Sequence, residues 1–272
     1  MIPKVDFHTH TSYCDGKDTP RQMVEEAYRR GFSCLGISGH SFTSFDDGWC
    51  MSLENTKKYI EEINLLKKEY QGRMDILCGI ERDYYATPSE FIFDYVIGSV
   101  HYVKVGQEYF SVDYTPEETK RIVNEYFQGD FDAFAESYFS NVSDIVEKTD
   151  CDIIGHFDLV SKFSDSLGIH ESERYLEAGY NAIRNLIKYD KPFEINIGAI
   201  IRGYKQVPYP SEKFMAEILR LGGKVCVSGD CHNCCNLGNK LEVGYSFARK
   251  CGFDTVQVFT KDGFHELKIV DI

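Results

Sequence analysis

Short runs of apolar and β-branched residues recur along the chain, and polar or glycine-containing segments separate them. Such runs are typical of strands that are buried on both faces in a parallel sheet. The pattern predicts seven strands, at residues 4–7, 34–38, 76–80, 95–100, 152–155, 193–197 and 224–228.

The segments between these strands carry apolar residues at spacings of three and four, which indicates amphipathic helices. Helices are predicted at residues 19–30, 53–70, 115–127, 131–148, 171–189, 211–221 and 241–250. Ser211 follows Pro210 and is predicted as an N-cap, and Gly31, Gly222 and Gly252 stand where helices should end.

Strands that alternate with helices this regularly predict an α/β fold with a mostly parallel sheet, either closed into a barrel or open and doubly wound. No repeat, low-complexity tract or Pro/Gly/Ser-rich linker divides the sequence. Because β/α barrels are commonly of this length, residues 1–272 are expected to form a single domain.

The chain is acidic, with 43 acidic and 30 basic side chains and a formal net charge of -13. A surface of this charge repels a phosphate backbone, so nucleic acid is not an expected partner. Carboxylates that bind divalent cations would be neutralised locally, which leaves small anionic substrates possible.

The chain starts without a signal-peptide pattern and has no apolar run of the roughly 18 residues that a membrane span needs. We therefore expect a cytoplasmic protein without a membrane partner. Ten cysteines are scattered through apolar runs and are predicted to be reduced thiols. The cluster at 231–235 resembles a zinc knuckle but lacks a second ligand pair at finger spacing.

Barrels and open α/β sheets both place active sites at the carboxyl ends of their strands. Metal-ligating residue types occur at all seven predicted strand ends, and six of the eight histidines are among them. These residues are Asp6, His8, His10, His40, Glu81, His101, His156, Asp158, Glu194, Asn196, Asp230 and His232.

A single histidine at a strand end is more often structural than a metal ligand, but burying this many imidazoles and carboxylates together is costly without cations. His8 and His10, two residues apart on a strand, point to the same face, and Asp230 and His232 repeat that spacing. Glu81 has two oxygens to share between ions. Mixed imidazole and carboxylate ligands favour Zn²⁺, Mn²⁺ or Fe²⁺. Two such ions about 3.5–4 Å apart would activate water for displacement at phosphorus, so phosphate ester hydrolysis is predicted.

Six motifs that occur in order resemble the polymerase and histidinol phosphatase (PHP) superfamily: DFHTH at 6–10, SGHS at 38–41, GIE at 79–81, GSVH at 98–101, GHFD at 155–158 and GDCH at 229–232. The stretches ERDYY at 81–85, HFDLVSKF at 156–163 and EIN at 194–196 are similar to the histidinol-phosphatase branch.

The resemblance implies a distorted (β/α)7 barrel that holds three divalent metal ions (Zn, Mn or Fe), with a metal-bridging hydroxide that attacks phosphorus. It implies one ion on His8, His10, Glu81 and Asp230, a second on Glu81, His101 and His156, and a third on Asp15, His40 and His232. Many superfamily members have histidine where this chain has Asp15, so the third ion is expected to bind most weakly.

Arg202, which follows the sixth strand, is the best candidate for a clamp on the phosphoryl oxygens, and a surface arginine paired with a carboxylate is the alternative. Asp158 is expected to orient a ligand histidine or the nucleophile. The leaving alkoxide would take a proton from His40, His232 or water. Asp83 is interpreted as a solvated carboxylate, with contact to a substrate amine as its alternative.

The function implied by the resemblance is hydrolysis of L-histidinol phosphate to L-histidinol and phosphate. Three alternatives stay open: a phosphatase for another small ester (a nucleotide, a sugar phosphate or phosphotyrosine), a non-catalytic metal-binding module, and a proofreading-type domain that acts on nucleic acid. The acidic charge disfavours the last, and the complete set of ligand positions disfavours the module. The sequence does not specify an oligomeric state.

Overall fold

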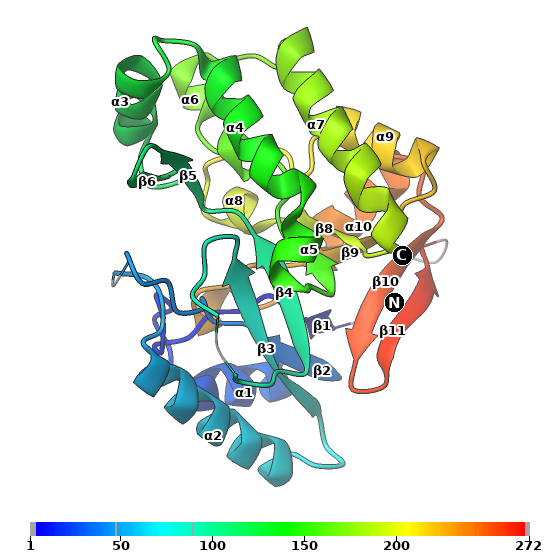
Figure 1. Cartoon of the computed structure of the whole chain (residues 1–272). Helices are drawn as coiled ribbons and strands as arrows, with labels where there is room; N and C mark the ends of the chain where they lie inside the picture. Colours follow the sequence, from blue (N-terminus) through cyan, green and yellow to red (C-terminus); the bar gives the residue numbers. More distant parts are fainter. Residues whose placement is uncertain (1–3, 47, 89, 270–272) are drawn as a thin grey trace.

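A computed structural model describes residues 4–46, 48–88 and 90–269 of the chain (Figure 1). It has an α/β fold with a nine-stranded sheet in the order β1-β2-β3-β4-β7-β8-β9-β10-β11, in which the β10–β11 pair is antiparallel and the other pairs are parallel. The strands are β1 Val5–Asp6, β2 Cys34–Ile37, β3 Asp75–Asp83, β4 Tyr95–Ser99, β7 Ile153–Ile154, β8 Phe193–Asn196, β9 Val225–Ser228, β10 Thr255–Thr260 and β11 Gly263–Lys268.

The seven predicted strands correspond to β1 to β4 and β7 to β9. Four further strands were not predicted. Two of them, β10 and β11, extend the sheet, and the other two, β5 Tyr102–Val105 and β6 Glu108–Ser111, form a separate antiparallel hairpin. β5 starts soon after β4 ends, so the apolar pattern of the two strands merges into one run.

All seven predicted helices are present, and residues 131–148 are divided into two helices at Asp144. The α-helices are α1 Pro20–Arg29, α2 Leu53–Glu69, α3 Pro116–Tyr126, α4 Phe131–Ser143, α5 Ile145–Thr149, α6 Ser164–Leu167, α7 Glu173–Leu186, α8 Gly198–Ile201, α9 Glu212–Arg220 and α10 Leu241–Lys250. Short 3-10 helices lie at Leu159–Ser161, Ile187–Tyr189 and Cys234–Asn236.

The helix ends follow the predicted signals. Gly31, Gly222 and Gly252 each stand two residues after a helix and have positive φ, the conformation that glycine adopts most easily. Ser211 is the N-cap residue of α9, but its hydroxyl makes no capping hydrogen bond. Its backbone N–H instead donates to Asp158 Oδ2 at 3.1 Å.

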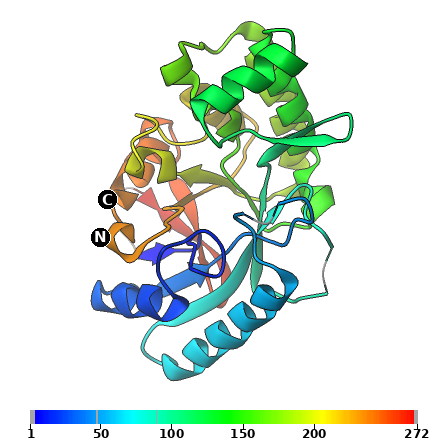
Figure 2. The same cartoon turned by 90° about the vertical axis from the view of Figure 1, so that its left-hand side faces the viewer.

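Hydrogen bonds join the residues that follow β1 to those that follow β9. Thr9 and Cys231 form a parallel bridge, in which His10 N donates to Cys231 O at 2.8 Å and Cys231 N donates to His8 O at 3.1 Å. Figure 2 shows this neighbourhood, with the dark blue loop after β1 beside the orange segment after β9. The bridge brings the start of the chain to residues more than 200 positions away.

The hydrophobic core lies on both sides of the sheet. α1 and α2 pack at one end of the molecule in Figure 1, and α4, α7 and α9 pack at the other. The Tyr95 side chain packs directly against Gly79 in β3 and Gly36 in β2. A Cβ atom on Gly79 would lie 2.2 Å from the Tyr95 ring, and a Cβ atom on Gly36 would lie 2.2 Å from the Tyr95 hydroxyl. These glycines therefore let a fully buried tyrosine fit between strands.

The ten cysteines are all free thiols in the structure, as predicted. Along the described residues, every helix is too short or too polar to cross a bilayer.

Candidate metal centre

The nine predicted metal ligands converge at the carboxyl ends of the parallel strands. They form four overlapping groups, in each of which one ligand atom per residue lies within 4.8 Å of the others. The groups are His10, Asp15, His40 and His232; His8, His10 and Asp230; His8, Glu81 and His156; and His40, Glu81 and His101. Within the described residues, none of these four groups includes a cysteine.

Glu81, near the end of β3, lies at the middle of the cluster. Its Oε1 is 2.8 Å from His156 Nε2 and 3.3 Å from His101 Nε2. Its Oε2 is 2.9 Å from His40 Nδ1 and 3.3 Å from His8 Nε2. Each oxygen thus faces a different pair of imidazoles, which is the arrangement that a carboxylate shared between two cations requires.

His8 and His10 lie side by side after β1, with ring centroids 5.2 Å apart. Asp230, which follows β9, places its Oδ1 3.4 Å from His10 Nε2 and 3.8 Å from His8 Nε2. The bridge between Thr9 and Cys231 sets this approach, because it fixes the backbone on both sides.

Asp15 lies on the loop after β1 and is the most exposed of the nine, with 27% of its side chain accessible. Its Oδ2 is 3.1 Å from His232 Nε2, and its Oδ1 is 3.6 Å from both His10 Nδ1 and His40 Nε2. A backbone hydrogen bond from Lys17 N to His232 O, 2.8 Å long, holds this loop against the segment after β9.

The donor set fits divalent cations. His8 Nε2, His10 Nε2 and Glu81 Oε2 are buried and have no hydrogen-bond partner, although these atoms face one another. An unsatisfied buried polar atom costs about 1–3 kcal/mol, and an ion that these three atoms coordinate would remove that cost. Imidazole and carboxylate ligands together are typical of zinc, manganese and iron sites.

The buried side chains of the cluster shift one another's pKa values in both directions. Burial would lower the pKa of His101, but the neighbouring Glu81 carboxylate raises it to about 10. The pKa of Glu81 itself is held well below its ordinary value, because the charges of His8, His40 and His101 outweigh its burial. Burial, reinforced by His232 and His40, lowers the pKa of His10 to about 3.

Two carboxylates outside the predicted ligand set orient candidate ligands. Glu194, in β8, lies 2.5 Å from His8 Nδ1 and accepts a 2.7 Å hydrogen bond from His156 N. A carboxylate on one ring nitrogen directs the other nitrogen of that ring toward a metal. Glu194 was noted at its strand end but was given no role.

Asp83 corrects the sequence interpretation, which took it for a solvated carboxylate. It is buried, and its Oδ2 accepts a 2.9 Å hydrogen bond from His101 N and lies 3.3 Å from His101 Nδ1. The signal was present in the sequence, because residues 81 and 83 of one strand share a face.

Arg202, which follows α8, lies in the pocket next to candidate ligands. Its Nη2 donates to Asp230 Oδ2 at 2.9 Å, and its Nη1 donates to the Asp230 carbonyl at 3.0 Å and lies 3.2 Å from His232 Nδ1. A Cβ atom on Gly198 would lie 2.7 Å from Asp230 Oδ2, so glycine is needed for this approach.

Asp158 is buried and does not line the pocket. Its side chain accepts a hydrogen bond from Ser211 N at 3.1 Å and, within the described residues, makes none with a histidine. Burial raises the pKa of this carboxyl to about 6, although Lys205 opposes the shift. The orienting role expected for Asp158 therefore stays a prediction.

A cavity of about 170 Å3 opens onto the cluster. It is lined by Asp15, His40, Trp49, Glu81, His101, Asp113, His156, Leu159, Lys162, Arg202, Tyr204, Asp230 and His232. Trp49, Asp113, Leu159, Lys162 and Tyr204 were not predicted from the sequence. Leu159 lies in the 3-10 helix Leu159–Ser161, Asp113 lies just after the β5–β6 hairpin, and the others lie on irregular segments, so their positions depend on tertiary packing.

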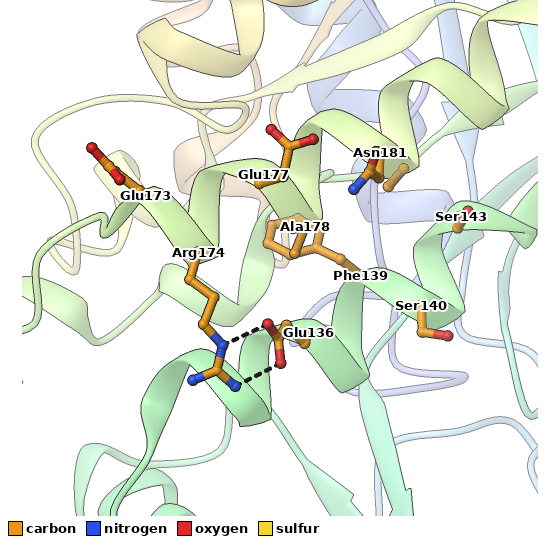
Figure 3. A pocket seen from close by; sticks show the side chains of 10 residues that line it. Glu136, Phe139, Ser140, Ser143, Glu173, Arg174, Glu177, Ala178 and Asn181 are labelled. Carbon is orange, nitrogen blue, oxygen red and sulfur yellow. Dashed lines mark hydrogen bonds and ion pairs between the residues drawn. The ribbon is translucent and has the colours of Figure 1, made fainter.

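A larger cavity of about 630 Å3 lies between α4 and α7, away from the metal-ligating side chains (Figure 3). Across it, Arg174 Nε donates to Glu136 Oε1 at 2.6 Å. Its other polar lining consists of serine, glutamate and asparagine side chains from the two helices. This groove carries none of the predicted site residues.

Comparison with known proteins places these residues in a family. The PHP domain family model matches residues 6–198. The chain is 25% identical to a probable histidinol-phosphatase of Schizosaccharomyces pombe over 94% of this chain and 90% of that protein. It is 26% identical to the histidinol-phosphatase of Bacillus subtilis over 92% of this chain and 100% of that protein.

A solved structure has a similar fold. The histidinol phosphate phosphatase of Lactococcus lactis, crystallised with zinc, L-histidinol and phosphate, superimposes with a TM-score of 0.69 at 22% identity. The match covers 97% of this chain and 100% of that one.

Proposed function

Because the chain belongs to the PHP domain family, we propose that it is a metal-dependent histidinol-phosphatase, which hydrolyses L-histidinol phosphate to L-histidinol and phosphate. The observation that carries this proposal is the convergence of His8, His10, Glu81 and Asp230, with five further ligand-type residues, around one pocket. Relatives that match over nearly the whole chain are histidinol-phosphatases, and one neighbour binds zinc, L-histidinol and phosphate.

We propose that three divalent ions, zinc, manganese or iron, bind to the nine residues. The proposed sets are His8, His10, Glu81 and Asp230; Glu81, His101 and His156; and Asp15, His40 and His232. The unpartnered buried atoms of His8, His10 and Glu81 support the first set. The exposure of Asp15 supports weaker binding at the third.

Bound divalent ions supply Lewis acidity, which withdraws charge from the phosphoryl oxygens and makes water a stronger nucleophile. Glu194 holds the ring of His8 with its Nε2 toward Glu81. Arg202 directs two of its five N–H donors to Asp230 and a third lies toward His232 Nδ1, which leaves two donors for phosphoryl oxygens. His40 and His232 line the pocket and are the proposed donors of a proton to the leaving alkoxide, with water as the alternative.

Finer features belong to the same proposal. We propose that residues 1–272 form one domain, that the parallel strands form a distorted (β/α)7 barrel, and that the protein acts in the cytoplasm without nucleic-acid or membrane partners. The bridge between Thr9 and Cys231 supports the barrel, and the net charge of -13 supports the absence of nucleic acid.

The test is a substrate profile of the purified protein, saturated in turn with zinc, manganese and iron. We expect kcat/KM to be highest for L-histidinol phosphate, compared with a nucleotide, a sugar phosphate and phosphotyrosine. A higher kcat/KM for one of those esters would reject the proposed substrate. Fewer than two transition ions per chain, together with no phosphatase activity, would favour a non-catalytic module.

A further inference from the structure

One carboxylate lines the metal pocket without belonging to any of the four metal-ligating groups. Asp15, Glu81 and Asp230 line the same pocket, but each has an oxygen within 3.6 Å of an imidazole nitrogen. Asp113 is 8% exposed and belongs to none of these groups. It is therefore a pocket anion that the proposed metal site does not use.

The position of Asp113 is fixed by the β5–β6 hairpin. Tyr102 and Ser111 are paired across the hairpin, and Val112 N donates a 2.9 Å hydrogen bond to His101 O. Asp113 follows directly and lines the same pocket as His101, a candidate ligand that faces Glu81. A substrate bound in this pocket can therefore contact Asp113 as well as the candidate metal site.

Asp113 is charged and retains hydrogen-bonding capacity. Lys162 Nζ donates to its Oδ2 at 3.0 Å and to its carbonyl at 2.9 Å, and Ser111 Oγ donates to its Oδ1 at 3.1 Å. Burial alone would raise the pKa of Asp113, but the Lys162 ammonium more than offsets this and lowers it. Because each carboxylate oxygen accepts about two hydrogen bonds, each has one free position.

The wall beside Asp113 is aromatic and apolar. Trp49, Leu159 and Tyr204 line the pocket, and the Lys162 ammonium lies 5.1 Å from the centroid of the Tyr204 ring. The pocket therefore combines an anion with flat apolar surfaces, and a substrate with an ammonium group and a planar ring complements both.

We propose that Asp113 accepts a hydrogen bond from the ammonium group of the substrate, and that it selects amino-alcohol phosphates over phosphate esters that lack an amine. This inference rests on the proposed function, because L-histidinol phosphate carries its ammonium on the carbon next to the ester carbon and its imidazole ring beyond. Asp113 is thus a specificity-determining residue, and the hairpin that carries it is part of the substrate site.

The test compares kcat/KM for L-histidinol phosphate with kcat/KM for its analogue in which hydrogen replaces the amine. We expect the unaltered protein to prefer the amine-bearing ester. In Asp113→Asn the ratio of the two values should fall at least about tenfold, because the amide carries no charge to match the ammonium. The control Asp165→Asn removes a charge from an exposed residue nearby and should keep the ratio.

An unchanged ratio in a metal-replete Asp113→Asn protein would overturn the inference, as would equal use of both esters by the unaltered protein. Those results leave the phosphatase assignment intact. No turnover of either ester by the metal-replete unaltered protein would instead overturn the proposed function and the inference with it.

The single substitution leaves the Lys162 ammonium mostly buried without its partner, which can prevent folding. The double variant Asp113→Asn/Lys162→Gln removes both charges and leaves no unpaired ion. We expect the same fall in the ratio for this variant. A folded, metal-replete double variant that keeps the original ratio would overturn the inference.

Discussion

Glu81 is the side chain on which most of the candidate ligands depend. Four imidazoles lie within 3.3 Å of its two oxygens, and it is almost completely buried. A glutamine at this position has the same size but cannot supply two anionic ligand atoms. Replacing Glu81 with glutamine should therefore lower activity far more than it lowers stability.

We therefore predict that Glu81→Gln lowers kcat by at least about 100-fold while the protein stays folded. Steady-state kinetics measures kcat, metal analysis measures the ions bound per chain, and circular dichroism measures whether the protein is folded. Glu177→Gln, on the exposed face of α7, is the matched control and should keep full activity. A folded, metal-replete Glu81→Gln protein with near-normal kcat would show that the site lies elsewhere.

Glu194 acts on the metal site only through His8 and the backbone of His156. Removing its charge should leave the ligands in place but loosen the His8 ring, and changes of this kind typically cost 10- to 100-fold in metal affinity or activity. For Glu194→Gln we expect a loss of about that size, measured by titration against a chelator of known affinity. An unchanged metal affinity would mean that Glu194 has only a structural role.

At the scale of the elements, the sequence predicted the parts whose signal is local. Strands such as β2 and β9 are continuous apolar runs, and the ends of α1 and α9 coincide with glycines that take positive φ. The convergence of the candidate ligand side chains was predictable as well, because parallel strands bring their carboxyl ends together.

Features that depend on tertiary packing could not be predicted in this way. The β5–β6 hairpin has only four residues per strand, and their burial does not alternate, so the sequence carries no clear strand pattern there. As a result, Asp113 was missed, and so were Lys162 and Trp49, which lie on irregular segments. Asp83 was placed in solvent although it shares a strand face with Glu81, because its hydrogen-bond partner His101 lies 18 residues further along the chain.

The packing of β3 against β4 provides a test of stability that is separate from the chemistry. A Cβ atom on Gly79 would lie 2.2 Å from the buried Tyr95 ring, so Gly79→Ala must displace that ring. Overpacking of this kind typically costs about 1–3 kcal/mol of unfolding free energy.

We predict that Gly79→Ala lowers the unfolding free energy measured by urea denaturation by about 1–3 kcal/mol, with an unchanged m-value. Gly48→Ala is the control, because the nearest atom to its Cβ would be 3.6 Å away. Equal stability of the two variants would contradict the packing described for Tyr95.

For the whole molecule, the candidate ligands come from segments spread over most of the chain, so we expect metal binding to stabilise the fold. A ligand present at 1,000 times its dissociation constant stabilises the native state by about 4 kcal/mol. For a chain of this size, that corresponds to about 10 °C in Tm.

Removal of metal with a chelator should therefore lower Tm by about 10 °C, and restored zinc or manganese should reverse the change. The Tm values of the metal-free and reconstituted proteins can be measured by calorimetry. A fully demetallated protein with the original Tm would show that the cations do not stabilise the fold.

The bridge between Thr9 and Cys231 also bears on how the protein is made. His8 and His10 leave the ribosome more than 200 residues before Asp230 and His232, the partners that complete their surroundings. A nascent chain that stops short of β9 therefore carries only part of the site, whatever portion of it has already folded. A complete site is thus expected only after translation has passed β9.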